Sequence, residues 1–405
     1  MNLITIMKHT ILCNSLRVLF LMSFILVGRG LRAQAPAFAR GADVSWCTEM
    51  EASGKQFYNT AGQPTELMAL LRECGMNAVR LRVWVNPERA YGAWSDKADV
   101  LVKARRAHAQ GLALMIDFHY SDFFADPGRQ DLPAAWSGYT LAQLKEAVTA
   151  HTVDVLSALK AEGINPAWVQ VGNETRSGMM WDTGKIDWSK QGAAAWTNYV
   201  QLSNAGYDAV KSVLPQAQVI VHIDNGPDDN AWFFKAFKQY GGKFDMIGLS
   251  HYPGTSWRSD NTKTVANIQA LSNQFGVPVI IAETGYDASN ETLAAEVMTD
   301  FMTRLTGTSA CRGVFYWEPE VYGWWKPAYY NTLGWNAYGK GAFTSMGRPS
   351  AALVPFFDTD GIECLHAVSA AGLQTFDLAG RCVDRMSRGV LIERTGTTTR
   401  KVIKH

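Results

Sequence analysis

The feature that most constrains the fold of this chain is a series of eight short apolar runs, rich in β-branched residues. These predicted strands are Gly41–Val44, Val79–Trp84, Ala113–His119, Trp168–Gly172, Gln218–Ile223, Met246–Ser250, Pro278–Glu283 and Gly313–Trp317. Amphipathic, helix-like segments lie between them, among them Thr65–Cys74, Asp96–Gln110, Leu141–Ala161 and Ala194–Val213. Such alternation is typical of parallel βαβ units, and eight strands predict a closed (β/α)8 TIM barrel of the α/β class.

The two ends of the chain differ in character from this repeating region. Lys8 and Arg17 precede an apolar run at 18–27, and small residues follow at 31–35, which predicts a cleaved signal peptide over 1–35. The run is shorter than the roughly 20 residues that span a bilayer, so an uncleaved anchor is the lesser alternative. The barrel is expected over 36–357. Short alternating runs in the tail at 358–405 predict a small C-terminal β appendage.

Composition excludes several classes of partner. With 38 Lys and Arg against 37 Asp and Glu, the charge is too balanced to favour nucleic acid or an anionic membrane. Five cysteines follow the predicted signal peptide without C-x-x-C spacing, which argues against a zinc site and a disulfide framework. A bridge between Cys364 and Cys382 stays open. We predict no metal and no cofactor, and a protein that is secreted or held at the cell surface.

Polar residues stand at the end of every predicted strand. They are Asp43, Arg80 with Arg82, Asp117 with His119, Asn173 with Glu174, His222 with Asp224, His251 with Tyr252, Glu283, and Trp317 with Glu318. Because the carboxyl ends of barrel strands meet at one mouth, these side chains are expected to converge there on an active site. Any single one of them could instead form a structural ion pair or a cap.

Two of these strand ends carry the residue type needed to hydrolyse a glycosidic bond. A retaining glycosidase uses two carboxyl groups about 5 to 5.5 Å apart, one as acid and one as nucleophile. Glu174 closes the fourth strand, directly after Asn173, and Glu283 closes the seventh. This pattern resembles the clan A glycosidase barrels. The resemblance implies that Glu174 is the acid/base, Glu283 the nucleophile, and Asn173 a ligand of the sugar 2-hydroxyl.

The neighbours of the two carboxyl groups predict their division of labour. Arg80 and Tyr252 are expected to hold the pKa of Glu283 down, and a dehydrated setting beside Glu283 is expected to raise the pKa of Glu174. His119, His222 and His251 could order these groups or contact the sugar, although a lone histidine is more often structural.

Six motifs in order across the barrel narrow the resemblance. They are Gly41–Ser45, Val79–Pro87, Asp117–Asp122, Val171–Glu174, Ser250–Pro253 and Tyr316–Pro319. Together they resemble glycoside hydrolase family 53, the endo-β-1,4-galactanases, which implies internal cleavage of β-1,4-galactan in type I arabinogalactan. Beside Asn173, the resemblance implies substrate contacts from Asp43, Arg80, Trp84, Asp117, His119, His222, Asp224, His251, Tyr252, Trp317 and Glu318.

The chain also departs from that family. The segment Thr284–Asp287 replaces the usual aromatic residue followed by proline, and no acidic cluster matches the calcium loop of some members. Aromatic residues after the eighth strand, Trp317, Tyr322, Trp324 and Trp325, are expected to form a sugar platform. The tail motifs Phe376–Arg381 and Arg388–Ile392 resemble type IX sorting tails, which implies contact with a secretion machinery. Another clan A endoglycosidase, such as a mannanase or xylanase, and a non-catalytic glycan-binding protein are the alternatives.

Overall fold

A computed structural model of the chain describes residues 35–356, 374–376, 389–395 and 398–404. The predicted signal peptide lies almost wholly outside these residues, as do Cys364 and Cys382. Within the described residues, no helix combines the length and the apolar character that crossing a membrane requires.

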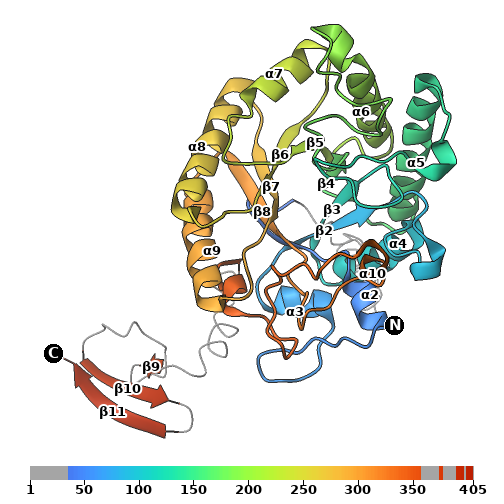
Figure 1. Cartoon of the computed structure of the whole chain (residues 1–405). Helices are drawn as coiled ribbons and strands as arrows, with labels where there is room; N and C mark the ends of the chain where they lie inside the picture. Colours follow the sequence, from blue (N-terminus) through green and yellow to red (C-terminus); the bar gives the residue numbers. More distant parts are fainter. Residues whose placement is uncertain (1–34, 357–373, 377–388, 396–397, 405) are drawn as a thin grey trace, which may run out of the picture.

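Eight parallel strands form a closed barrel, in which each strand pairs with the next and β8 pairs with β1 (Figure 1). They are β1 (Ala39–Asp43), β2 (Ala78–Val83), β3 (Ala113–Phe118), β4 (Trp168–Val171), β5 (Gln218–Ile223), β6 (Met246–His251), β7 (Val279–Thr284) and β8 (Cys311–Trp317). The predicted barrel is therefore confirmed, with strand ends that differ from the prediction by a residue or two.

Helices surround the barrel (Figure 1). They are α2 (Cys47–Ala52), α3 (Leu67–Glu73), α4 (Lys97–Ala109), α5 (Leu141–Ala161), α6 (Ala193–Val213), α7 (Ala231–Gln239), α8 (Trp257–Phe275) and α9 (Glu291–Thr306). Helix α5 begins at a capping box formed by Thr140 and Gln143, which satisfies amide groups that would otherwise lack partners at a helix start. Its buried residues recur at helical spacing toward the barrel, which is the periodicity that predicted it.

Short elements occupy the loops and the end of the barrel region. Three are 3-10 helices, η1 (Arg89–Tyr91), η2 (Ala134–Trp136) and η3 (Ala351–Phe356), and a fourth is the single-turn helix α10 (Tyr330–Leu333). In the tail, β9 (Gln374–Phe376), β10 (Gly389–Thr395) and β11 (Thr398–Lys404) form a three-stranded antiparallel sheet in the order β11-β10-β9. The small β appendage expected from the alternating runs is present.

An apolar plug fills the barrel near the amino ends of the strands. Trp168 and Phe315 meet edge to face inside it, with ring centroids 6.0 Å apart. A Cβ atom on Gly41 would lie 2.3 Å from the Phe315 ring, so only glycine at this position leaves room for the phenylalanine. The plug closes the barrel from below and confines accessible chemistry to the carboxyl ends of the strands.

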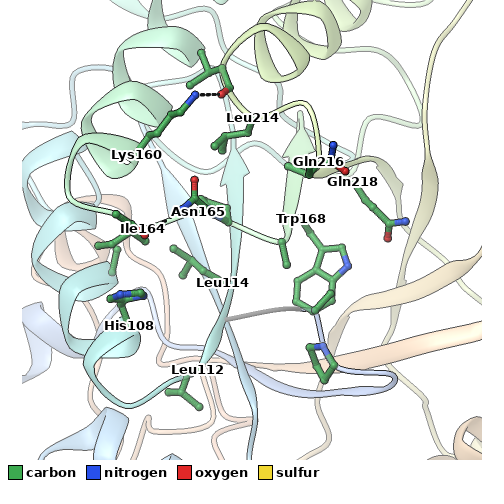
Figure 2. A pocket seen from close by; sticks show the side chains of 18 of the residues that line it. His108, Leu112, Leu114, Lys160, Ile164, Asn165, Trp168, Leu214, Gln216 and Gln218 are labelled. Carbon is green, nitrogen blue, oxygen red and sulfur yellow. Dashed lines mark hydrogen bonds between the residues drawn. The ribbon is translucent and has the colours of Figure 1, made fainter. Parts of the chain in front are cut away.

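A cavity of about 1010 Å³ opens at the amino ends of β3, β4 and β5, at the closed end of the barrel. Figure 2 shows Leu112 and Leu114 on one side of it and Trp168 with Gln218 on another, and Lys160 bonded to a backbone carbonyl. None of the polar strand-end residues lines this cavity. Although this cavity is large, it is not the catalytic site, because the predicted site residues lie at the carboxyl ends of the strands.

Strand alternation turns His251 away from the barrel interior. Ser250 points inward, so its neighbour points out toward α8 and α9. The His251 ring lies 4.2 Å from the Phe301 ring, and its nitrogens pair with Asn261 at 2.8 Å and Thr264 at 3.0 Å. The prediction that His251 contacts the sugar is wrong, because the fully buried ring packs behind the barrel wall.

Burial lowers the pKa of His251 to about 4. Because this lies below the unfolded value of about 6.5, its stabilising contribution is full above pH 6.5 and is lost as pH falls toward 4. Between pH 7 and pH 5, the unfolding free energy of the wild type should fall by about 2 kcal/mol more than that of His251→Gln. Urea unfolding at both pH values measures this, and the control Thr262→Ala, at an exposed position of α8 without a titrating group, should keep the wild-type difference. An unchanged pH dependence in His251→Gln would contradict the assignment.

Candidate active site

The Glu283 carboxylate lies at the end of β7 and is held at both oxygens. Its Oε1 is 3.0 Å from an Arg80 guanidinium nitrogen, and its Oε2 accepts a hydrogen bond of 2.9 Å from the Tyr252 hydroxyl. Glu283 keeps 6% exposure, while Tyr252 is 37% exposed. The two neighbours predicted from sequence are therefore the ones that contact this carboxylate, and one face of the group stays open to the mouth of the barrel.

Arg80 is the centre of a buried network beneath that carboxylate. It donates to Asp43 at 2.6 Å and to Asp117 at 2.7 Å, and also to Asn173 and Gln170. The side chains of Arg80, Asp43 and Asp117 are inaccessible to solvent. The prediction that these three contact substrate is therefore wrong: alternation places them inside the barrel one layer below the accessible surface, where they position other groups.

His119 connects this network to the accessible layer. Its Nδ1 accepts the Ala125 amide hydrogen at 2.9 Å, so its Nε2 carries the proton and donates to Asp117 at 2.9 Å. The ring keeps 4% exposure. His119 is thus held in one tautomer and one orientation at the edge of the site.

The Glu174 carboxyl lies at the end of a chain of three polar side chains. Ser250 donates to its Oε1 at 2.6 Å, and His222 Nε2 lies 2.9 Å from the Ser250 oxygen. Burial lowers the pKa of His222 well below its usual value, helped by the Arg80 charge, so the ring is neutral. Because Ser250 donates onward, His222 donates to Ser250, and its Nδ1 accepts from Gln170. His222 is fully buried and orients Glu174 through Ser250, so its predicted contact with substrate is wrong.

The backbone at Glu174 is also unusual. Its φ is +48°, in the left-handed region that non-glycine residues rarely adopt, and Gly172 just before it has φ +80°. Such conformations persist only where the surroundings hold them, and they gather at functional sites. The turn after β4 directs Glu174 toward the mouth instead of along the strand.

The two carboxyl groups differ in how strongly their surroundings oppose ionisation. Burial and the nearby Glu283 charge raise the pKa of Glu174 well above its usual value. Burial also raises the pKa of Glu283, while Arg80 and Tyr252 act in the opposite direction. The expectation of a net lowering of the Glu283 pKa is wrong, because desolvation together with the nearby Asp117 and Asp43 charges outweighs Arg80 and Tyr252. Because the Arg80 cation contacts Glu283 and the Glu283 charge acts on Glu174, the surroundings oppose ionisation more strongly at Glu174, which is the expected ordering.

Ser250 provides a direct test of this arrangement. Its hydrogen bond favours the Glu174 carboxylate and so lowers the pKa of that group. Ser250→Ala should therefore raise the pKa of Glu174, moving the alkaline limb of the kcat/KM profile by roughly half a pH unit or more upward. A pH series on the variant measures the shift. The surface substitution Ser189→Ala should leave both limbs in place, and a downward shift in Ser250→Ala would contradict the role.

Two further predicted substrate ligands have other partners. Asp224 accepts a hydrogen bond of 2.6 Å from Arg176 and lies beside Glu174 only as a nearby charge. Glu318 is fully buried, where it pairs with Arg82 and accepts the Trp46 amide hydrogen at 3.0 Å. Burial raises the pKa of Glu318 to about 7. The prediction of a sugar contact is wrong for Glu318, because its carboxyl group is fully buried against Arg82 and the Trp46 amide.

Aromatic rings line the mouth on the side of β1, β2 and β8. Trp317 packs edge to face on Trp46 at 5.0 Å and on Tyr338 at 4.5 Å, with part of its ring still accessible. Trp84 is 7% exposed beside His119. Of the predicted platform, Trp324 is 79% exposed, whereas Trp325 is buried with its Nε1 bonded to Ser53. Tyr322 donates its hydroxyl hydrogen to the Gln56 carbonyl oxygen at 2.7 Å.

The sequence interpretation did not single out Ser250, Gln170 or Tyr338. Ser250 and Gln170 occupy inward-facing positions of β6 and β4, so the alternation along each of these strands is the signal that could have found them. Tyr338 comes from a loop, where no periodicity applies. Among the residues that the structure describes, no three His, Cys, Asp or Glu side chains are grouped to hold a metal ion.

Comparison with known proteins places this geometry among glycosidases. The sequence model of glycosyl hydrolase family 53 matches residues 39–294. An arabinogalactan endo-β-1,4-galactanase of Thermothelomyces thermophilus is 32% identical over 305 residues, covering 69% of this chain and 89% of that protein. An endo-β-1,4-galactanase of Bacillus subtilis is 31% identical over 340 residues, covering 75% of each.

Solved structures agree with the sequence comparison. A fungal β-1,4-galactanase superposes with a TM-score of 0.67 at 28% identity, covering 79% of this chain and 99% of that one. The family 53 catalytic domain of Ignisphaera aggregans superposes with a TM-score of 0.68 at 26% identity, covering 80% and 99%.

Proposed function

Since the chain belongs to glycosyl hydrolase family 53 and is a glycosidase, we propose that it is an endo-acting, retaining enzyme that cleaves β-1,4-galactosidic bonds in galactan. The observation that carries the mechanism is the pair Glu174 and Glu283, one holding the proton and the other held by Arg80 and Tyr252. The proposal that galactan is the substrate rests on the galactanase relatives.

In the first step, a Glu283 oxygen attacks the anomeric carbon while the bond from that carbon to the leaving oxygen breaks. Glu174 gives its proton to the leaving oxygen, so that a neutral hydroxyl departs and a galactosyl ester remains on Glu283. Esterification removes the negative charge of Glu283, which is one cause of the raised pKa of Glu174. The pKa of Glu174 therefore falls after the first step, and the group becomes a base.

In the second step, the Glu174 carboxylate takes a proton from water. The water oxygen attacks the anomeric carbon and displaces Glu283, which restores both carboxyl groups and the original anomeric configuration. Asn173 suits the 2-hydroxyl of the reacting sugar. Its Nδ2 donates one hydrogen to the Ala125 carbonyl oxygen at 2.7 Å, which leaves the second hydrogen free for the sugar.

The test of this function is reducing-sugar release from debranched β-1,4-galactan, with mannan and xylan beside it. Short galacto-oligosaccharides from galactan alone are the expected products, and proton NMR should show the β-anomer first. Activity on mannan or xylan only would keep the mechanism and overturn the substrate. Binding of galactan without release of sugar would favour a glycan-binding protein.

We further propose that the enzyme acts outside the cell, as a free or surface-held protein. A polymeric substrate cannot reach an enzyme that stays inside, and the segment 1–35 has the pattern of a signal peptide. The catalytic region is then 36–357. The segment 358–405 is proposed as a sorting domain that contacts the secretion machinery, and fractionation of cells expressing the chain with and without it tests this role.

A further inference from the structure

A second pocket lies beside the active site, on the same end of the barrel. Its volume is about 330 Å³, and it lies between the loops that follow β1, β2, β3 and β8. Its lining includes Trp84, Tyr91, Phe123 and Tyr329, but neither catalytic carboxyl group, nor Asn173 or Tyr252. The pocket is therefore separate from the point of cleavage.

A wall of rings separates the pocket from the catalytic groups. Trp84 meets the His119 ring edge to face at 6.4 Å, and Phe124 meets Trp317 at 6.2 Å. Both Trp84 and Phe124 also line the pocket. A ligand on one side of this wall thus contacts rings that touch the active site on the other side.

The pocket is built from loops that are fixed to each other. Asp122 accepts the amide hydrogens of Asn86 and Ala134, each at 2.8 Å, and so ties the β2 loop to the β3 loop. The Val85 amide donates to the Ser121 carbonyl oxygen at 2.9 Å. Such bonds hold the pocket open before a ligand arrives, which lowers the entropic cost of binding.

The lining carries one polar group without a partner. The Nε1–H of Trp84 is buried and donates to no acceptor, although buried donors are nearly always satisfied. The Trp84 ring packs against Phe123 at 5.3 Å and Phe124 at 5.0 Å, and Tyr329 lies 4.8 Å from the Phe123 ring. A free donor among aromatic faces suits a neutral sugar, which offers hydroxyl oxygens and apolar C–H faces.

We propose that this pocket is a side subsite that binds one neutral sugar ring attached as a branch to the galactan backbone. This proposal rests on the proposed function, because it assumes that a galactan chain occupies the mouth of the barrel. The volume is near the lower limit for ligand pockets and suits one ring, whereas a backbone needs a groove past Glu174 and Glu283. At the rim Arg129 pairs with Asp131, and the lining also carries Glu49, Glu88 and Asp122, which disfavour an acidic branch.

The test compares kcat/KM on debranched galactan and on galactan with single arabinosyl branches. Tyr91→Ala removes one wall of the pocket, and Tyr329→Ala removes the ring that faces Tyr91 and Phe123. Each should lower kcat/KM on the branched polymer about tenfold, mainly through KM, and change the value on the linear polymer less than twofold. Tyr139→Ala is the matched control, since Tyr139 is 39% exposed in a neighbouring loop outside the lining.

The outcomes separate the pocket from the function. Equal losses on both polymers, or none in either variant, would overturn the side subsite while galactanase activity stands. If the wild type cleaves neither polymer, the proposed function fails. In that case, calorimetric titration with a branched oligosaccharide tests the side subsite by itself. Weaker binding by Tyr91→Ala than by Tyr139→Ala supports the side subsite, and equal binding rejects it.

Discussion

Replacing Glu283 by Gln should lower kcat by roughly 10⁴-fold or more while galactan binding persists, because the amide cannot form the glycosyl ester. The amide keeps the shape of the side chain, and its single oxygen can still accept from Arg80, while its NH2 group can donate to the oxygen of the Tyr252 hydroxyl. Reducing-sugar release and calorimetry on the same preparation measure turnover and binding separately.

The matched control is Glu296→Gln on α9, where the carboxylate pairs with Arg258 at the surface. It should turn over like the wild type, because an exposed ion pair contributes little to folding. If Glu283→Gln kept a tenth of the wild-type kcat, Glu283 would not be the nucleophile.

Replacing Glu174 by Gln should lower kcat on galactan by about 10³-fold, because the leaving oxygen then departs without a proton. The leaving group of a dinitrophenyl galactoside is dinitrophenolate, a stable anion that needs no proton in the first step. The kcat/KM for this galactoside should fall less than tenfold, whereas its kcat falls further because water has lost its base. Steady-state kinetics on both substrates measure the contrast.

That contrast distinguishes an acid/base from a residue that merely supports the site. Glu162→Gln, an exposed carboxylate paired with Arg105, should leave both substrates unaffected. Equal losses on galactan and on the aryl galactoside in Glu174→Gln would assign Glu174 a structural role instead.

The barrel could be read from the sequence because its signals are local and repeated. Each strand is a short apolar run, because both of its faces are buried in the barrel. The periodicity of its apolar residues predicts helix α5 with both ends correct to the residue. Strand ends drifted where geometry beyond the run decides pairing. The sequence run predicts β6 to end at Ser250, yet the strand continues to His251 after a shift in register.

The sequence predicts which strand-end residues gather at the site. It does not predict their division into a buried layer and a layer that is accessible from the mouth. Strand alternation decides which polar side chains enter the barrel, and it sends His251 outward and Ser250 inward. How deep an inward side chain lies depends on the tilt of the strands, which no local pattern states. The strand-end pattern therefore predicts Asp43, Arg80 and Asp117 as ligands, although all three lie below the accessible surface.

The Arg80 network also constrains how the sequence can change over generations. One guanidinium serves Asp43, Asp117 and Glu283 at once, so losing the cation would leave three carboxylates buried beside one another. Replacing any one of these four residues alone should destabilise the protein strongly. The network therefore cannot be changed through a series of single substitutions that each leave a folded enzyme. The loops above are joined by hydrogen bonds such as those of Asp122, whose loss leaves no group of buried carboxylates behind, so relatives that acquire new substrates should differ there and retain the four charged residues unchanged.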